Sequence, residues 1–350
     1  MQEVYTPKHT FADFAIDERI KANIAAKGYV TPTPIQDQII PHVLEGRDVV
    51  GIANTGTGKT AAFLIPLLNK VVQDRSQRIL IIVPTRELAQ QIEEEYLGFA
   101  RGSGFLSASV VGGANINPQK RRLRDDPYFV IGTPGRLKDL MSQRALDLSK
   151  FQTVVLDEAD RMLDMGFIHD MKFIMSHMSR ERHTLFFSAT LSREIEALVG
   201  NFLNNPVRVS VKTGDTSASV HQDVVRTSGK QKIDVLHDLL IQPEFSKVLV
   251  FGRTKHGVEK LSKTLQQRGF TAESIHGNKN QNKRQRALSD FKGNRVQVLV
   301  ATDVAARGID VADVSHVINY ELPTTYEDYV HRIGRTGRGG KRGKALTFVD

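Results

Sequence analysis

Three acidic residues stand close together directly after an apolar run. Residues 154–156 are apolar, and Asp157, Glu158 and Asp160 follow them. Like charges at this spacing repel one another, so the cluster is unfavourable unless a cation or a reaction offsets the repulsion. We therefore expect these carboxylates to hold a divalent cation or to take part in catalysis.

A glycine-rich segment upstream has the composition of a phosphate-binding loop. Segment 51–63, GIANTGTGKTAAF, follows an apolar run and opens a helix-like stretch, which is where such a loop belongs. Its glycines let backbone N–H groups turn toward phosphate oxygens, its lysine can reach the outer phosphates, and the last threonine hydroxyl can hold Mg²⁺. The usual pattern begins with Gly, where this chain has Ala53. We assign nucleotide contacts to Thr55, Gly56, Thr57, Gly58, Lys59 and Thr60.

The phosphate loop gives two of the carboxylates separate roles. Asp157, at the end of its strand, is expected to hold Mg²⁺ through water, together with Thr60. Glu158 is then free to polarise an attacking water, and Lys59 is the third candidate catalytic residue of this half. Asp160 lies beyond both and needs another role.

Positive charge is concentrated in the second part of the chain. Net charge is +9, with 25 basic and 24 acidic residues in 1–210 but 23 and 15 in 211–350. No acidic residue occurs from 330 to 349, a stretch that holds Arg332, Arg335 and Arg338. This asymmetry indicates a polyanionic partner, although a solvated basic face would give the same composition.

Short apolar runs alternate with helix-like segments along the whole chain, which is typical of parallel α/β domains with ligands at the strand ends. A polar stretch around 213–219 interrupts the alternation and is interpreted as a linker. We therefore predict two doubly wound domains, 1–210 and 221–350, joined by a flexible linker over 211–220. The predicted strands are 48–53, 79–84, 107–113, 128–134, 153–158 and 184–190, then 247–254, 270–277, 296–303, 314–321 and 344–350.

Composition excludes several classes of site. The chain has 350 residues, 40% of them hydrophobic, and no cysteine, so disulfides, thiolate metal sites and cysteine nucleophiles are excluded. No apolar run is long enough for a membrane span, and the first residues lack the apolar core of a signal peptide. These features favour a reducing compartment, and we expect a cytoplasmic protein without membrane association.

The ordered motifs resemble those of DEAD-box ATP-dependent RNA helicases, which belong to helicase superfamily 2. The resemblance runs from about Phe11 to Gly343 and rests on GYVTPTPIQ (28–36), the phosphate loop, PTRELA (84–89), TPGR (133–136), DEAD (157–160), SAT (188–190), ATDVAARGID (301–310) and HRIGRTGR (331–338). It implies two RecA-like domains that use ATP and Mg²⁺ and bind RNA.

The resemblance also implies roles for individual residues of the first domain. Gln36 would read adenine, and Tyr29, where the family usually has Phe, would stack on the base. Ser188 and Thr190 would hydrogen-bond Asp160 and so couple the nucleotide site to the arrangement of the domains. The RNA backbone would be held by Thr85, Arg86, Gly113, Thr133 and Arg136.

In the second domain the resemblance implies that Asp310 binds the ATP ribose and that Arg335 and Arg338 act as catalytic arginine fingers on the γ-phosphate. RNA contacts are expected from Arg253, Gln281, Arg284 and Thr302. Roles at the interface between the domains are expected for Arg307, His331 and Arg332.

The function that follows is an RNA-dependent ATPase that unwinds short RNA duplexes or remodels RNA–protein complexes. ATP and RNA would each bridge both domains, and closure would bend single-stranded RNA with little sequence preference. Three alternatives stay open at this stage: an ATP-gated RNA clamp with little unwinding, a DNA helicase of the same superfamily, and an unrelated phosphate-loop ATPase.

Overall fold

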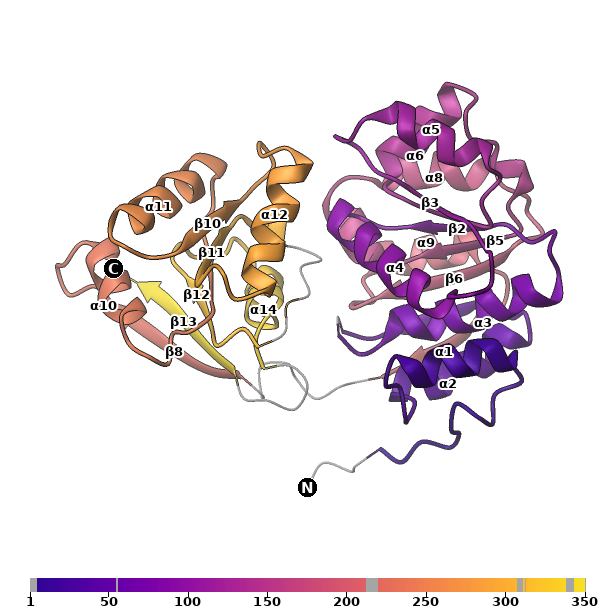
Figure 1. Cartoon of the computed structure of the whole chain (residues 1–350), viewed down its shortest axis with the longest axis horizontal. Helices are drawn as coiled ribbons and strands as arrows, with labels where there is room; N and C mark the ends of the chain where they lie inside the picture. Colours follow the sequence, from indigo (N-terminus) through magenta and orange to yellow (C-terminus); the bar gives the residue numbers. More distant parts are fainter. Residues whose placement is uncertain are drawn as a thin grey trace. The chain divides into compact units, whose positions relative to one another are not determined.

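The computed structural model describes residues 5–54, 56–211, 220–306, 311, 313–337 and 343–349. The chain divides into two compact units, 1–213 and 214–350. Both are built around a wholly parallel sheet with helices on its two faces (Figure 1).

Unit 1 contains a seven-stranded sheet in the order β3-β4-β2-β5-β6-β1-β7, in which every pair of neighbours is parallel. Its central strands are short and fully buried, because a parallel sheet is covered on both faces. The strands are β1 Val49–Ile52, β2 Ile79–Ile82, β3 Ser107–Val110, β4 Phe129–Gly132, β5 Thr153–Leu156, β6 His183–Ser188 and β7 Val207–Ser210.

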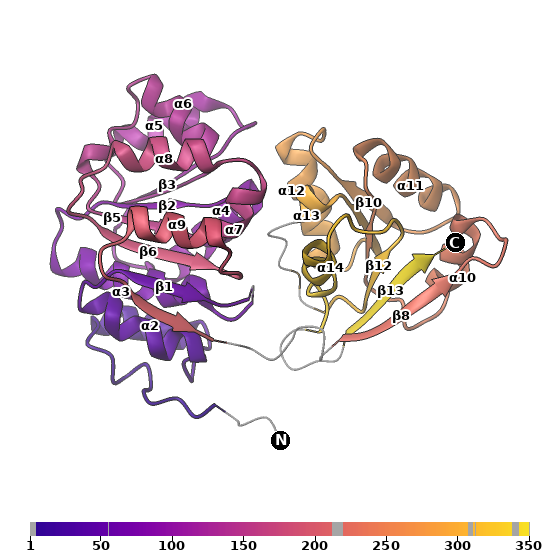
Figure 2. The same cartoon turned by 180° about the vertical axis from the view of Figure 1, so that it is seen from behind.

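Alternate strand residues of unit 1 point to opposite cores. Val49 packs with the helices α1 to α4, whereas its neighbour Val50 packs with α6 to α9 on the other face. The second group lies in front of the sheet in Figure 2. The helices are α1 Glu18–Ala26, α2 Pro34–Leu44, α3 Lys59–Gln73, α4 Arg86–Phe99, α5 Ile116–Arg124, α6 Pro134–Ser142, α7 Ala159–Asp164, α8 Ile168–Ser176 and α9 Arg193–Phe202, with the 3-10 turn η1 Leu148–Lys150.

Unit 2 contains a six-stranded parallel sheet in the order β10-β11-β9-β12-β13-β8. One core lies against α12 to α14 and the other against α10 and α11. The strands are β8 Val220–Arg226, β9 Val248–Phe251, β10 Ala272–Ile275, β11 Val298–Ala301, β12 His316–Asn319 and β13 Gly343–Val349. The helices are α10 Lys232–Leu240, α11 Lys255–Gln267, α12 Gln281–Lys292, α13 Asp303–Ala306 and α14 Tyr326–Ile333.

The eleven predicted strands are all present, and the predicted fold class of two doubly wound parallel-sheet domains is confirmed. The strands β7 and β8, which flank the predicted linker, were not predicted. Residue 220, placed in the linker, is the first residue of β8, and residues 212–219 lie outside the described part of the chain. Within the described residues no helix is both long and apolar enough to cross a membrane.

The parallel sheets determine where functional residues gather. In a parallel sheet the carboxyl ends of all strands meet at one edge, which is where α/β proteins bind ligands. In unit 1 the phosphate loop follows β1, the acidic cluster follows β5, and SAT ends β6. Since β5, β6 and β1 are consecutive in the sheet, these three motifs lie side by side.

Candidate functional site

The phosphate loop turns into α3 at a glycine that no other residue could replace without strain. Gly58 is the N-cap of α3 and has a φ of 93°, in the left-handed region that favours glycine. A Cβ atom at this position would lie 2.5 Å from Nε2 of Gln36, which is too close. The Nζ atom of the buried Lys59 donates to the carbonyl oxygen of Ala53 at 2.9 Å, so the lysine spans the loop. Thr55 lies outside the described residues.

Gln36 is buried against the phosphate loop, at the start of α2. Its Oε1 atom accepts from the backbone N–H of Thr33 at 2.9 Å, and its Nε2 atom donates to the carbonyl oxygen of Gly58 at 3.1 Å. The amide of this predicted adenine-reading residue therefore joins the α2 N-terminus to the phosphate loop.

Tyr29 lies in an aromatic cluster of unit 1. Its ring meets Phe11 edge-on at 6.1 Å between centroids and Phe99 at 5.5 Å. Burial, together with the nearby Glu95 carboxylate, raises the pKa of Tyr29 to about 12. Phe11 is buried in the core, so in this structure the upstream aromatic residue supports Tyr29.

The acidic cluster begins α7, and its backbone is strained. Glu158 is the N-cap of α7 and has φ 53° and ψ 49°, a left-handed conformation that residues other than glycine seldom adopt. Asp157 and Glu158 are buried, and Oδ1 of Asp157 accepts from the Glu158 N–H at 2.9 Å. Burial raises the pKa of Asp157, with the carboxylates of Glu158 and Asp160 acting in the same direction and Lys59 opposing them. The expected crowding of negative charge is therefore present.

Asp160 connects the acidic cluster to SAT. Its Oδ2 atom accepts from the backbone N–H groups of Ala189 and Thr190 at 2.9 and 3.0 Å, and from the Thr190 hydroxyl at 3.3 Å. The predicted hydrogen bond to Thr190 is confirmed. The one predicted from Ser188 is wrong, because the Ser188 hydroxyl donates instead to the Thr190 carbonyl oxygen at 2.8 Å. Ser188 thus stabilises the turn that presents the backbone donors.

The five predicted RNA-binding residues of unit 1 lie in the segments that follow three neighbouring strands. Thr85 follows β2, Gly113 follows β3 and Thr133 follows β4, and these strands are consecutive in the sheet. Gly113 has a φ of 69°, and a Cβ atom there would lie 2.1 Å from the guanidinium of Arg86. Glycine at this position is therefore required for the close approach of Arg86.

Sequence reasoning missed Gln119, a buried residue of α5 that organises this cluster. Its side-chain amide makes two hydrogen bonds of 3.1 Å with the backbone of Val111, and its Oε1 atom also accepts from Nη1 of Arg136 at 2.9 Å. The Nη2 atom of Arg136 donates to the Ala114 carbonyl oxygen at 3.1 Å. Gln119 lies on a strongly basic helix whose sequence gives no signal of this contact.

In unit 2 the predicted RNA-binding residues also follow strand ends. Arg253 follows β9 and Thr302 follows β11, which are neighbours in the sheet. Arg253 is exposed, and its backbone N–H donates to Oε2 of Glu321, which follows β12. Arg284 is buried in α12. Gln281 begins the same helix, but its side chain lies outside the described residues.

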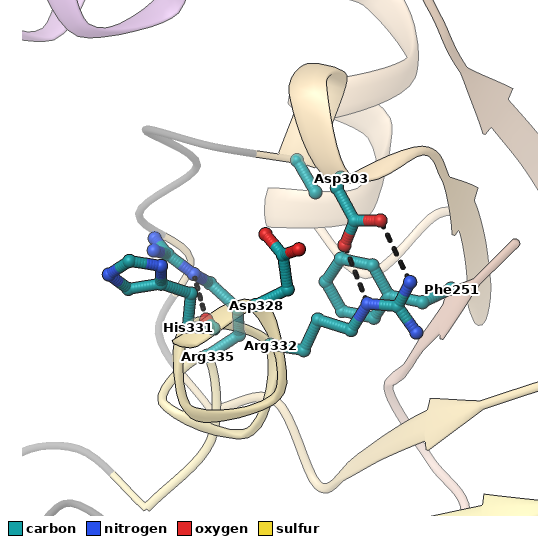
Figure 3. A pocket seen from close by; sticks show the side chains of 7 residues that line it. Phe251, Asp303, Asp328, His331, Arg332 and Arg335 are labelled. Carbon is teal, nitrogen blue, oxygen red and sulfur yellow. Dashed lines mark hydrogen bonds and ion pairs between the residues drawn. The ribbon is translucent and has the colours of Figure 1, made fainter. Parts of the chain in front are cut away.

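Arg332 is buried within unit 2, and Figure 3 shows its guanidinium turned toward Asp303. Its Nε and Nη2 atoms donate to the two oxygens of Asp303 at 2.5 and 2.8 Å. Nη1 donates to Oδ1 of Asn319 at 3.1 Å and to the Glu321 carbonyl oxygen at 2.7 Å. The guanidinium also lies over the ring of Phe251, 5.0 Å from its centroid. These contacts are all internal to unit 2, and the role at a domain interface stays a prediction for Arg332.

His331 and Arg335 point away from Asp303 (Figure 3). The Nε atom of the buried Arg335 donates to the His331 carbonyl oxygen at 3.1 Å. Both residues line the same small pocket as Arg332 and Asp328. The predicted residues Arg307, Asp310 and Arg338 lie outside the described part of the chain.

Two family models match the chain. The first is described as DEAD/DEAH box helicase and matches residues 33–198, and the second is described as helicase conserved C-terminal domain and matches residues 231–340.

The chain is similar to two curated bacterial proteins. It is 46% identical to the ATP-dependent RNA helicase CshA of Listeria monocytogenes, covering 97% of this chain and 66% of that protein. It is 45% identical to the DEAD-box ATP-dependent RNA helicase CshA of Bacillus licheniformis, covering 97% and 70%. The chain thus spans about two thirds of the length of these relatives.

Two solved structures extend the comparison. A hypothetical ATP-dependent RNA helicase from Sulfolobus tokodaii is 36% identical with a TM-score of 0.54, covering 95% of this chain and 97% of that one. Dbp5 of Saccharomyces cerevisiae, bound to RNA and ADP BeF3, is 30% identical with a TM-score of 0.85, covering 97% and 89%. These similarities extend over both units, and we conclude that the chain belongs to the DEAD-box family of ATP-dependent RNA helicases.

Proposed function

We propose that this protein is an RNA-dependent ATPase that unwinds short RNA duplexes or remodels RNA–protein complexes. One observation carries the proposal. At a single edge of the unit 1 sheet, a phosphate loop and an acidic cluster on β1 and β5 stand beside a group of threonine, arginine and bare backbone on β2, β3 and β4. On this proposal, a nucleotide-binding site and a surface that binds the RNA backbone would share one sheet.

The proposed chemistry is hydrolysis of ATP at the γ-phosphate. Water attacks the γ-phosphorus, Glu158 accepts its proton, and the bond to the bridging oxygen breaks so that ADP leaves with the electron pair. Lys59 neutralises charge on the outer phosphates, Gln36 selects adenine and Tyr29 flanks the base. Arg335, with Arg338 and the ribose-binding Asp310 outside the described residues, would complete the site from unit 2.

The residues of unit 1 fit a magnesium ion. Asp157 is a buried carboxylate whose pKa is raised by burial and by neighbouring carboxylates, an arrangement that a divalent cation would relieve. Among the described residues no group of three or more His, Cys, Asp or Glu could hold a metal ion by itself. Mg²⁺ would therefore be shared between Asp157, Thr60, water and the phosphates, as is usual for this hard cation, and it would neutralise charge on the transferring group.

RNA would be held through phosphates and riboses, and therefore with little sequence preference. Thr85, Arg86, Gly113, Thr133 and Arg136 form the unit 1 part of this surface. Arg253, Gln281, Arg284 and Thr302 form the unit 2 part. Ligands that contact both units would favour a closed arrangement, so ATP and RNA would each raise the affinity for the other.

Coupling of the nucleotide site to the RNA surface would run through Asp160, Ser188 and Thr190, with Arg307 and His331 on the other unit. The internal contacts of Arg332 suggest that it supports this second group from within. A chain without cysteine also suits a reducing compartment, and we propose a cytoplasmic location.

Steady-state ATP hydrolysis tests the proposal. The rate would be measured without polymer, with single-stranded RNA and with DNA of the same sequence, for the wild-type chain and for Glu158→Gln. We expect RNA to stimulate hydrolysis on the order of tenfold or more, DNA to do so far less, and Glu158→Gln to reduce turnover to a small residual rate while retaining ATP. A rate indifferent to RNA would contradict the proposal. RNA-stimulated hydrolysis without displacement of a short duplex strand would instead assign the protein to ATP-gated RNA clamps.

A further inference from the structure

Arg161 is among the largest fully buried side chains in the described part of the molecule, and it contacts the proposed catalytic base. Its Nη1 atom donates to Oε2 of Glu158 at 2.6 Å, and the side chains of the two residues are only 2% and 5% exposed. The backbone N–H of Arg161 donates in addition to Oδ1 of Asp160 at 3.0 Å. One residue therefore contacts two of the three carboxylates.

Stability alone is a weak explanation for this arrangement. Desolvation of two charges offsets most of their attraction, so a buried ion pair adds little to stability compared with apolar residues of the same size. The Nη2 atom of Arg161 is buried and has no hydrogen-bond partner among the described residues, which is a further cost. Glu158 also has a left-handed backbone conformation, and unfavourable features of this kind gather at functional sites.

The geometry restricts the carboxylate of Glu158. The pair links position i to i+3 of the short helix α7, whose N-cap is Glu158 itself. The ion pair holds Oε2 and the strained backbone holds Cα, so the side chain of Glu158 is constrained at both ends. A general base must lie within hydrogen-bond reach of the proton that it accepts, and small displacements are costly in rate.

We propose that Arg161 is a positioning residue that holds Glu158 in the orientation in which it accepts the proton of the attacking water. This inference rests on the proposed function, since it assigns Arg161 a part in the same hydrolysis. Arg161 acts through Glu158 and does not itself contact the nucleotide. Its removal should therefore lower kcat without weakening the binding of ATP.

The test uses the whole chain and measures kcat and KM for ATP with saturating single-stranded RNA. We expect Arg161→Gln to lower kcat by about 10- to 100-fold, with KM for ATP and the dissociation constant for ADP within about twofold of the wild type. Arg161→Lys keeps one donor and the charge, and should recover much of the lost rate. Arg182→Gln is the matched control. Arg182 is a partly buried arginine of the same unit, and it donates to the carbonyl oxygens of Ser179 and Phe202, at the amino ends of the strands.

A double-mutant cycle separates positioning from general packing. If Arg161 acts through Glu158, adding Arg161→Gln to Glu158→Gln should change the residual rate by less than about twofold. A kcat for Arg161→Gln within twofold of the wild type, or the same fractional loss in both backgrounds, would overturn the inference. If Arg161→Gln does not fold, Arg161→Lys carries the same cycle with a smaller expected loss. Absence of RNA-stimulated hydrolysis in the wild type would refute the proposed function, a result distinct from a variant that hydrolyses normally.

Discussion

A buried histidine at the amino end of β6 should make unit 1 sensitive to mild acid. The Nε2 atom of His183 lies 2.8 Å from the Arg47 carbonyl oxygen, to which it must donate. Its Nδ1 atom lies 3.4 Å from the ammonium of Lys70, which also donates to the Thr153 hydroxyl. Protonation of Nδ1 would place a second positive charge against Lys70. Burial and this neighbour lower the pKa of His183 to about 4.

The sign and size of the effect follow from linkage. An unfolded histidine has a pKa of about 6.5, so the unfolded chain takes up the proton first as the pH falls. The stability contributed by the neutral imidazole is complete above pH of about 6.5 and is lost progressively toward the folded pKa of about 4. Between pH 7 and pH 5 the loss is about 2 kcal/mol of unfolding free energy, from the same two pKa values.

Urea unfolding of the wild type and of His183→Gln, followed by far-ultraviolet circular dichroism, measures this term. Glutamine keeps a donor for the Arg47 carbonyl oxygen and does not titrate. The wild type should therefore lose about 2 kcal/mol more than the variant between pH 7 and pH 5. His177→Gln is the control, since His177 is exposed at the carboxyl end of α8 in the same unit. Equal losses for the wild type and His183→Gln would refute the reasoning.

Three further predictions concern single residues of the two units. Asp160→Ala leaves two backbone N–H groups without their acceptor, so the melting temperature should fall by an amount equivalent to about 2 kcal/mol; an unchanged value would contradict the assigned hydrogen bonds. Asp303→Ala removes the carboxylate paired with the buried Arg332, and urea unfolding should show unit 2 destabilised by about 3 kcal/mol, whereas an effect below half of that would mean that the remaining acceptors suffice. Gly58→Ala should weaken ADP binding at least about tenfold in calorimetric titration, because its Cβ would collide with the side chain of Gln36. Gly104→Ala, at a similar positive φ in open space, is the control and should bind ADP normally.

The sequence predicted the buried strands well because each is a continuous apolar run covered on both faces. It failed for β7 and β8. Residues of β7 alternate between buried and exposed, and β8 is exposed along most of its length. Both lie at the edge of their sheets, where only one side of the strand is paired and a continuous apolar run is not required. Their sequences therefore lack the continuous apolar run from which the other strands were predicted.

The candidate site could be predicted wherever its residues are close together in the sequence. The phosphate loop and the acidic cluster are short motifs whose residue types indicate their chemistry directly. The partners that hold them are chosen by folding and could not be inferred in the same way. Gln119 reaches Arg136 across seventeen positions, Ser188 turns toward a backbone carbonyl, and Arg161 pairs within its own helix, a contact that the residue type alone does not distinguish from a solvated charge.

Because both sheets are parallel, the motif residues follow the carboxyl ends of the strands, and the amino ends of the strands lie at the opposite edge of each unit. The amino-end edges are therefore suitable places for fluorescent labels. Ser179 lies between α8 and β6, and Glu244 lies between α10 and β9; both are exposed and both are near the amino ends of strands. Because the chain has no cysteine, Ser179→Cys and Glu244→Cys would introduce its only two thiols. A donor and an acceptor dye attached there would report the distance between the units during turnover, while every motif residue remained unmodified.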